Sequence, residues 1–148
     1  LQSGDTDTAV RTFKDIISRR PNHIMSQKSR LELAEEALKQ KNFDEAVRLA
    51  EAVIENVVDD NAARAQYIIG NRWFISGDYQ KAQDELMRVT ILYKNYEEWV
   101  AHARLLIAQC QNNLGNIEDA EKTLRDVMEM HPRDEFGQQA KKLLNEIR

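Results

Sequence analysis

The residues that could do chemistry in this 148-residue chain are its three histidines, its single cysteine and the acidic pairs that lie near predicted loops between units. The histidines are His23, His102 and His131, and no two of them have the i, i+4 spacing with which a helix presents two ligands to one metal ion. The single cysteine, Cys110, excludes an internal disulfide and a cysteine-built zinc site. It stands in an apolar stretch of sequence, which favours a buried structural thiol. We therefore expect no metal site.

The acidic pairs Asp59–Asp60 and Glu97–Glu98 could serve in acid–base catalysis or cation binding. Both pairs fall at the predicted loops between units, where a solvated acidic turn is the simpler interpretation. The sequence contains no P-loop, no GxSxG motif and no dinucleotide-binding fingerprint. We therefore expect no enzymatic activity and no cofactor, and we expect function to come from the shape of the fold.

The composition favours a mostly helical protein with one core. The chain is 42% apolar and 31% charged, and it has only five glycines and two prolines. A net charge of −4 argues against nucleic acid as a partner, and no apolar run is long enough to insert into a membrane. The chain begins at Leu1 without a signal peptide, and "LQSGD" resembles a helix end and a turn, so we expect a segment of a longer protein.

One short phrase occurs four times along the chain. It reads "GDTDTAVRTF" from residue 4, "KNFDEAVRLA" from residue 41, "GDYQKAQDEL" from residue 77 and "GNIEDAEKTL" from residue 115. The alanines within it, which follow one another at intervals of 37, 36 and 38 residues, are Ala9, Ala46, Ala82 and Ala120. A period of this length indicates stacked supersecondary units.

Small residues indicate how the two helices of each unit pack. Twelve positions before the last three of these alanines stand Ala34, Gly70 and Ala108, and apolar residues follow each alanine at i+4 and i+7. The turn between the two groups contains Gly77 and Gly115, with Lys41 in the equivalent place of the first full unit. A glycine there can take the left-handed conformation that ends a helix. The pattern predicts two helices that cross closely, and the crossing is copied along the chain.

We predict an all-α fold in which residues 1–148 form a single domain. The predicted helices span residues 6–20, 26–41, 44–58, 62–76, 79–94, 98–114, 117–131 and 135–147. The units are a partial repeat (1–22), three repeats (26–60, 62–96 and 98–134) and a capping helix (135–148). The capping helix has a polar side, as the end of a repeat stack requires, whereas the first helix has no cover. We therefore expect exposed apolar surface to concentrate at Phe13, Ile16 and Ile17, with self-association through this helix as one consequence.

The repeat resembles the tetratricopeptide repeat family, whose pattern is a small residue, a Gly-rich turn, an aromatic residue, an alanine and a proline twelve positions later. Here Pro21 and Pro132 lie twelve positions after two of the alanines. Two features depart from the family: the period exceeds its usual length of about 34 residues, and a site that is commonly Trp or Leu is Arg30, Gln66 and Arg104. The resemblance implies a right-handed α-solenoid of stacked antiparallel helix pairs.

The long loops are similar to those of repeat proteins of the bacterial cell envelope, including outer-membrane assembly lipoproteins and proteins of the Tol–Pal system. That similarity implies a periplasmic or envelope location, and the cytoplasm is the alternative. Family members that clasp chaperone carboxylates use Lys and Asn on the first helices. The corresponding residues here are Leu31 and Glu35, so we do not expect that activity.

In such a stack the first helices line a concave groove. Counting back fifteen, eleven and eight positions from the second alanine of each unit, the predicted groove residues are Leu31, Glu35, Leu38, Tyr67, Asn71, Phe74, Leu105, Gln109 and Asn112. The two aromatic residues either bind a partner or only pack between neighbouring first helices. We expect a non-catalytic scaffold that binds a peptide or protein segment in this groove. The alternative is a structural spacer or self-association module within a larger, envelope-associated repeat protein.

Overall fold

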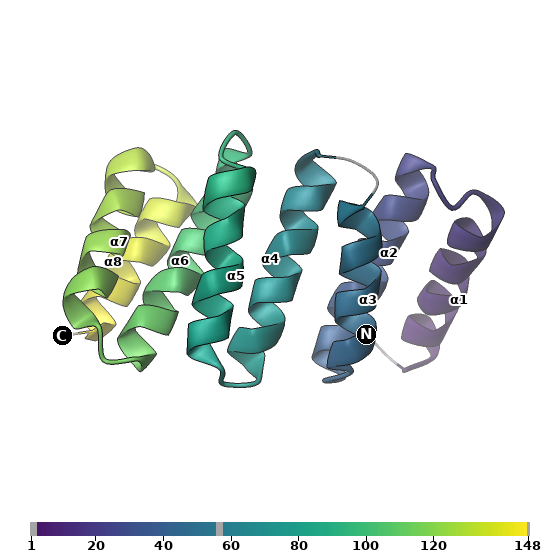
Figure 1. Ribbon diagram of the computed structural model, residues 1–148, viewed down its shortest axis with the longest axis horizontal. Helices are drawn as coiled ribbons and strands as arrows, with labels where there is room; N and C mark the ends of the chain where they lie inside the picture. The colour runs from purple at the N-terminus through teal and green to yellow at the C-terminus, as the bar shows by residue number, and fades with distance from the viewer. Residues whose placement is uncertain (1–2, 56–57, 148) are drawn as a thin grey trace.

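The computed structural model describes residues 3–55 and 58–147, and this part of the chain consists of eight helices joined by turns and short loops. The helices are α1 (Ser3–Arg19), α2 (Ile24–Lys39), α3 (Phe43–Ile54), α4 (Asp60–Ile75), α5 (Tyr79–Leu92), α6 (Glu97–Asn113), α7 (Ile117–Met130) and α8 (Glu135–Ile147). They stand side by side in chain order (Figure 1). The predicted all-α solenoid is confirmed. The predicted third helix ran to residue 58; α3 ends at Ile54, and residues 56–57 lie outside the described part.

Three equivalent turns join α2 to α3, α4 to α5 and α6 to α7. Each contains one residue with positive φ: Lys41 at 57°, Gly77 at 82° and Gly115 at 84°. The next backbone N–H donates to the carbonyl five residues earlier, in the pairs Asn42 to Ala37 (2.8 Å), Asp78 to Trp73 (3.0 Å) and Asn116 to Gln111 (2.8 Å). This is the Schellman arrangement, which satisfies carbonyls left free at a helix end. Lys41 therefore takes the left-handed conformation that glycine takes in the other two turns.

The predicted close crossings are present in the core. The second-helix alanines Ala46, Ala82 and Ala120 are each 0% exposed. Opposite them, Ala34 and Ala108 are also fully buried, and Gly70 is buried against α5. A Cβ placed on Gly70 would lie 2.5 Å from side-chain carbons of Leu86, so the helices could not approach this closely with a larger residue there.

The polar residues that replace the family's Trp or Leu are bonded to neighbouring segments. Gln66 is buried, and its Nε2 donates to the backbone oxygen of Glu85 (3.0 Å) and to its carboxylate (2.8 Å), which ties α4 to α5. Arg30 donates to the backbone oxygen of Pro21 at 2.6 Å, and the guanidinium of Arg104 contacts the sulfur of Met130. Hydrogen bonds and packing of the long side chains thus stand in for an apolar contact.

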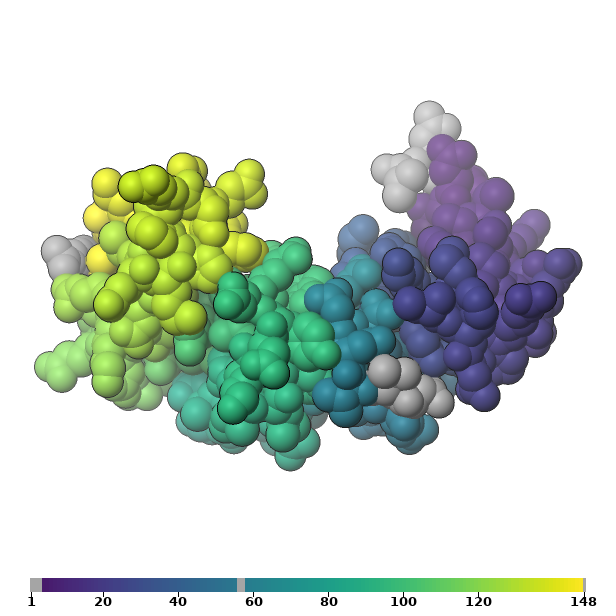
Figure 2. All heavy atoms as spheres, turned by 90° about the horizontal axis from the view of Figure 1, so that it is seen from above, coloured from purple at the N-terminus to yellow at the C-terminus, as the bar shows by residue number. Residues whose placement is uncertain are grey.

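The two helices of each unit occupy different layers. The first helices approach one another in series, α2 with α4, α4 with α6 and α6 with α8, in addition to the second helices beside them. Within the described residues, the second helices α1, α3, α5 and α7 make no such approach to one another. The stack therefore curves with the first helices inside. Figure 2 shows the result: the two ends rise on one side and leave a hollow over the middle units.

The expected concentration of apolar exposure on α1 is wrong. Phe13, Ile16 and Ile17 are only half-exposed, and Phe13 and Ile17 pack against the core cluster of the first full unit. The most exposed large apolar side chains lie instead at helix ends beside the loops between units, at Ile24, Met25, Val58, Ile91, Leu92 and Met130. Neither α1 nor any other helix in the described ranges is long and apolar enough to cross a membrane.

Candidate partner-binding groove

The inner layer, formed by α2, α4, α6 and α8, is the surface on which the sequence places a partner. Three of the nine predicted residues are not available there: Leu31 is 0% exposed, Leu38 is 6% exposed and Leu105 is 5% exposed. Leu31 and Leu38 belong to a core cluster with residues of α3 and α4, and Leu105 packs with residues of α7 and α8. Because the first helices pack against one another, these three leucines are buried between helices. They are therefore not part of the candidate groove.

The other six predicted residues are half-buried: Glu35, Tyr67, Asn71, Phe74, Gln109 and Asn112. The side-chain amides of Asn71 and Asn112 make no hydrogen bond to any residue that the structure describes. Gln109 donates only to the backbone oxygen of Leu105, at 3.4 Å, one turn earlier on its own helix. Two amides with free donors and acceptors therefore remain for a partner's backbone.

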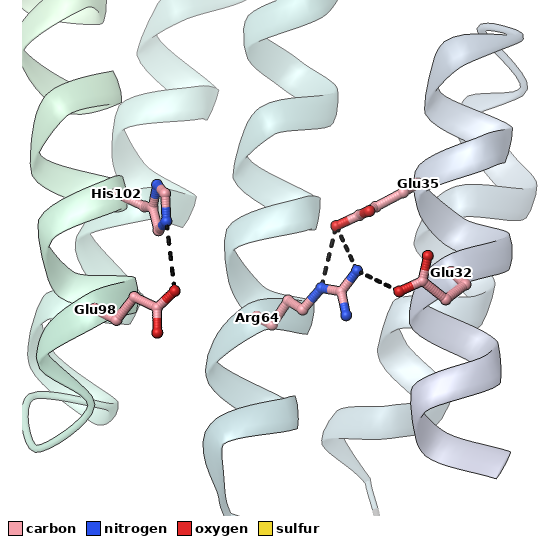
Figure 3. A network of polar contacts seen from close by, with 5 residues as sticks. All are labelled: Glu32, Glu35, Arg64, Glu98 and His102. Carbon is pink, nitrogen blue, oxygen red and sulfur yellow. Dashed lines mark hydrogen bonds and ion pairs between the residues drawn. The ribbon is translucent and has the colours of Figure 1, made fainter. Parts of the chain in front are cut away.

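An ion-pair network joins the inner faces of α2 and α4 (Figure 3). Arg64 lies with its Nη2 2.8 Å from the Glu35 carboxylate and 3.1 Å from that of Glu32. The arginine side chain is largely buried, whereas both glutamates are about half-exposed. Burial lowers the pKa of Arg64, but the hydrogen bonds and charges of Glu35 and Glu32 more than offset this and raise it. The network fixes α4 against α2 and leaves carboxylate edges facing solvent.

Aromatic rings continue the inner layer from α4 to α8. The His102 ring centroid lies 5.8 Å from that of Tyr67, 5.0 Å from Trp99 and 4.8 Å from Phe136, within the range of favourable aromatic contacts. Burial, with the nearby Glu35 charge, raises the pKa of Tyr67 to about 12, so its phenol stays neutral. Burial lowers the pKa of His102, although Glu98 acts in the opposite direction from 4.0 Å. These four half-buried rings, Tyr67, Trp99, His102 and Phe136, form one aromatic row along the inner layer.

Two hollows lie between α6 and α8 at the C-terminal end of this layer. They enclose about 140 and 180 Å³. Gln109, Leu143 and Glu146 line both of them, and Asn112 lines the smaller one. One free amide therefore stands beside a space in which a partner side chain could lie.

Sequence reasoning missed Arg64, His102 and Phe136. A signal existed for the first two, because the site eighteen positions before the second alanine is Lys28, Arg64 and His102 in the three full units. These polar residues stand one helical turn from the predicted groove sites. Phe136 had no such signal, since α8 is followed by no second alanine from which to count.

The candidates for chemistry have structural roles. Cys110 is buried, which raises the pKa of its thiol to about 12, so it is no nucleophile at neutral pH. Asp59 caps α4 by accepting a hydrogen bond from the backbone N–H of Ala62 at 2.9 Å. His131 lies with its Nδ1 2.7 Å from the carboxylate of Asp134, which caps the start of α8. In the described ranges, no three metal-binding side chains cluster closely enough to hold an ion.

Comparison with known protein families agrees with this architecture. Two family models, both described as tetratricopeptide repeat, match residues 1–67 and residues 102–134, together about two thirds of the chain. The first match covers α1 to α3 and the start of α4, and the second covers most of α6 with all of α7. No curated protein matches the sequence.

Proposed function

Because the chain belongs to the tetratricopeptide repeat family, whose repeats are generally non-catalytic protein-interaction modules, we propose that it is a scaffold that binds a segment of another protein on its inner layer. The observation that carries this proposal is the pair of unbonded amides on the inner layer: Asn71 on α4, one helical turn from Tyr67, and Asn112 on α6, beside a hollow between α6 and α8. An extended segment offers backbone N–H and C=O groups that such amides can pair, and apolar side chains that aromatic surfaces can cover.

The amides are better positions than the half-buried rings for testing whether a partner binds on the inner layer. Tyr67 contacts Trp99 and His102, so its replacement would disturb the inner layer as well as any binding site. Asn71 and Asn112 form no such contacts, and alanine at either position leaves the packing of α4 and α6 in place. A loss of binding in Asn71→Ala or Asn112→Ala would therefore report on the partner contact itself.

The experiment begins with peptides selected from a random library for binding to the wild-type protein. Each substitution removes one hydrogen bond to the peptide, so we expect affinity to fall by about 3- to 10-fold for each variant. The matched control is Asn145→Ala, which removes an exposed amide from α8. Affinity should not change in the control, and the melting temperature should not change in any of the three.

A structural spacer is the alternative function, and the same experiment separates it from the scaffold. A spacer would yield no selected peptide, or only peptides whose binding is insensitive to Asn71→Ala and Asn112→Ala. Resonances of the indole N–H of Trp99 and of the His102 ring locate the peptide independently, because both rings lie in the aromatic row. Perturbations confined to the second helices would refute the groove. An envelope location stays a prediction.

A further inference from the structure

The inner layer around Tyr67 carries more negative than positive charge. The carboxylates of Glu32 and Glu35 share one cation, Arg64, so one of their two negative charges is not compensated within the network. Glu98 of α6 is 67% exposed, and in the described ranges the one titratable cation within 4.0 Å of its carboxylate is the His102 ring. Because burial lowers the pKa of His102, this ring is mostly neutral at pH 7 and leaves the charge of Glu98 uncompensated as well.

The two negative sites lie on opposite sides of one phenol ring. Figure 3 shows Glu35 reaching toward α4 from α2 and the pair of Glu98 and His102 on α6, with α4 between these two helices. Tyr67 of α4 is close to both: burial first, and the Glu35 charge second, raise the pKa of its phenol, and its ring centroid is 5.8 Å from that of His102. The phenol oxygen makes no hydrogen bond to any residue that the structure describes, so it can accept one from a ligand.

The aromatic row adds a second attraction for positive charge. The rings of Tyr67, Trp99 and His102 contact one another with centroid separations of 5.0–5.8 Å, and all three are half-buried, so part of each remains open to solvent. The face of a tyrosine or tryptophan ring is negative and attracts cations. This chain uses that attraction elsewhere, where the Arg72 guanidinium lies 3.5 Å from the Trp73 ring centroid. Among the described residues, no cation covers Tyr67 or Trp99 in this way.

The inner layer toward α8 differs, because it presents the amides of Gln109 and Asn112, and the larger hollow there is lined by one cation and one carboxylate, Lys142 and Glu146. We propose, on the premise that the chain is a scaffold, that the bound segment carries a lysine or arginine whose cation lies against Tyr67 between Glu35 and Glu98. Asn71 stands one helical turn from Tyr67 and can pair the backbone of the segment beside that basic residue. The partner is thereby a segment with a basic residue, not an acidic or wholly apolar one.

The first test uses the peptides selected from the random library whose binding responds to Asn71→Ala. Each lysine and arginine of a peptide is replaced in turn by glutamine, and we expect one of these replacements to lower affinity by about 5- to 20-fold. Glu98→Gln in the protein should weaken the original peptide by about 2- to 5-fold and should not weaken further the peptide that lacks the critical basic residue. The matched control Glu51→Gln removes the same charge from an exposed position of α3, in the outer layer, and should leave affinity unchanged.

Charge reversal and NMR locate the cation independently. A peptide with glutamate in place of the critical basic residue should bind Glu98→Lys more tightly than the wild-type protein, by about 2- to 5-fold. The pKa of the His102 imidazole should fall further when the original peptide is bound than when its glutamine form is bound, because a positive charge beside the ring opposes protonation.

Two sets of results separate this inference from the scaffold function on which it rests. Peptides that respond to Asn71→Ala but have no critical basic residue, or that are insensitive to Glu98→Gln, would overturn the cation site and leave the scaffold function intact. Equal weakening by Glu51→Gln would also overturn it, because the attraction would then come from net charge and not from a site. If no peptide is selected, or none responds to Asn71→Ala or Asn112→Ala, both the scaffold function and the cation site are rejected.

Discussion

Gly70 lies at a close crossing of α4 and α5, and its replacement by alanine gives a direct measure of that crossing. A Cβ at this position would lie 2.5 Å from both Cγ and Cδ2 of Leu86, and 3.3 Å from its backbone nitrogen. Leu86 is fully buried, so its side chain has no solvent to turn into. The clash must therefore be relieved by movement of α5 or by a strained rotamer.

Two opposing effects set the magnitude for Gly70→Ala. Alanine in a helix interior is favoured over glycine by about 0.8–1.0 kcal/mol. Overpacking of a close-packed core costs about 1–3 kcal/mol. The third unit holds Ala108 together with Leu124, both fully buried, so a wider crossing is attainable and the lower half of that range applies. We expect the free energy of unfolding to fall by about 0–1 kcal/mol, although helix propensity alone predicts a rise.

A double-mutant cycle separates the two effects. Leu86→Ala alone removes a buried leucine and should cost about 2–5 kcal/mol. In that background the clash is absent, so Gly70→Ala should now stabilise by about 1 kcal/mol. The combination Ala–Ala already exists in the first unit as Ala34 and Ala50. The expected coupling between the two sites is about 1–2 kcal/mol in favour of the double variant.

Urea unfolding followed by circular dichroism at 222 nm, on the wild type, the two single variants and the double variant, measures all four corners of the cycle. The reasoning would be refuted if Gly70→Ala stabilised the wild-type protein by the full propensity gain. It would also be refuted if the substitution had the same effect with and without Leu86, because the crossing would then have room for the added carbon.

Two further predictions concern a turn and a pH dependence. Lys41→Gly should stabilise the protein by about 1 kcal/mol, because a left-handed conformation is unfavourable for lysine. The control Lys39→Gly, within α2, should destabilise it by about as much. A melting temperature of Lys41→Gly at or below the wild-type value would contradict the predicted stabilisation. Burial lowers the pKa of His102, so the unfolded chain binds a proton that the folded protein resists, and stability should be complete above about pH 6.5 and decline at lower pH. Melting temperatures between pH 7.5 and 5.5 should fall less steeply in His102→Gln, and an unchanged slope would count against this role.

The parts of the fold that could be predicted are those determined by residues that lie close together in the sequence. A small residue, a turn and an alanine lie within about a dozen positions, and each has one physical meaning, so the crossings at Ala46, Ala82 and Ala120 and the left-handed turns at Gly77 and Gly115 follow from the residues alone. The groove depends on how far each first helix is rotated about its axis. The repeat interval does not report that rotation, which is why Leu31 and Leu105 were placed on the surface although they lie in the core.

Contacts between units could not be predicted from the repeat pattern either. Arg64 binds Glu32 across 32 positions of sequence, and no periodicity distinguishes this glutamate from the exposed glutamates elsewhere. The aromatic row required Phe136 of α8 to meet His102 of α6, a contact between a repeat and a helix that does not share its register. Long-range pairs of this kind follow from the stacking geometry rather than from the units themselves.

The difference between the two layers also decides how the stack can bend. Tightening its curve would compress the inner layer, where rings lie 4.8–5.8 Å apart and Arg64 bridges two helices, and close-packed groups resist compression. Flattening the curve separates these contacts without compressing them, while the second helices, whose backbones do not approach one another in the described ranges as those of the first helices do, have room to come closer. We therefore expect the solenoid to open more easily than it closes. It can widen around a bulky ligand, but it cannot close further around a slender one. A radius of gyration that decreases on ligand binding would be incompatible with that elastic asymmetry.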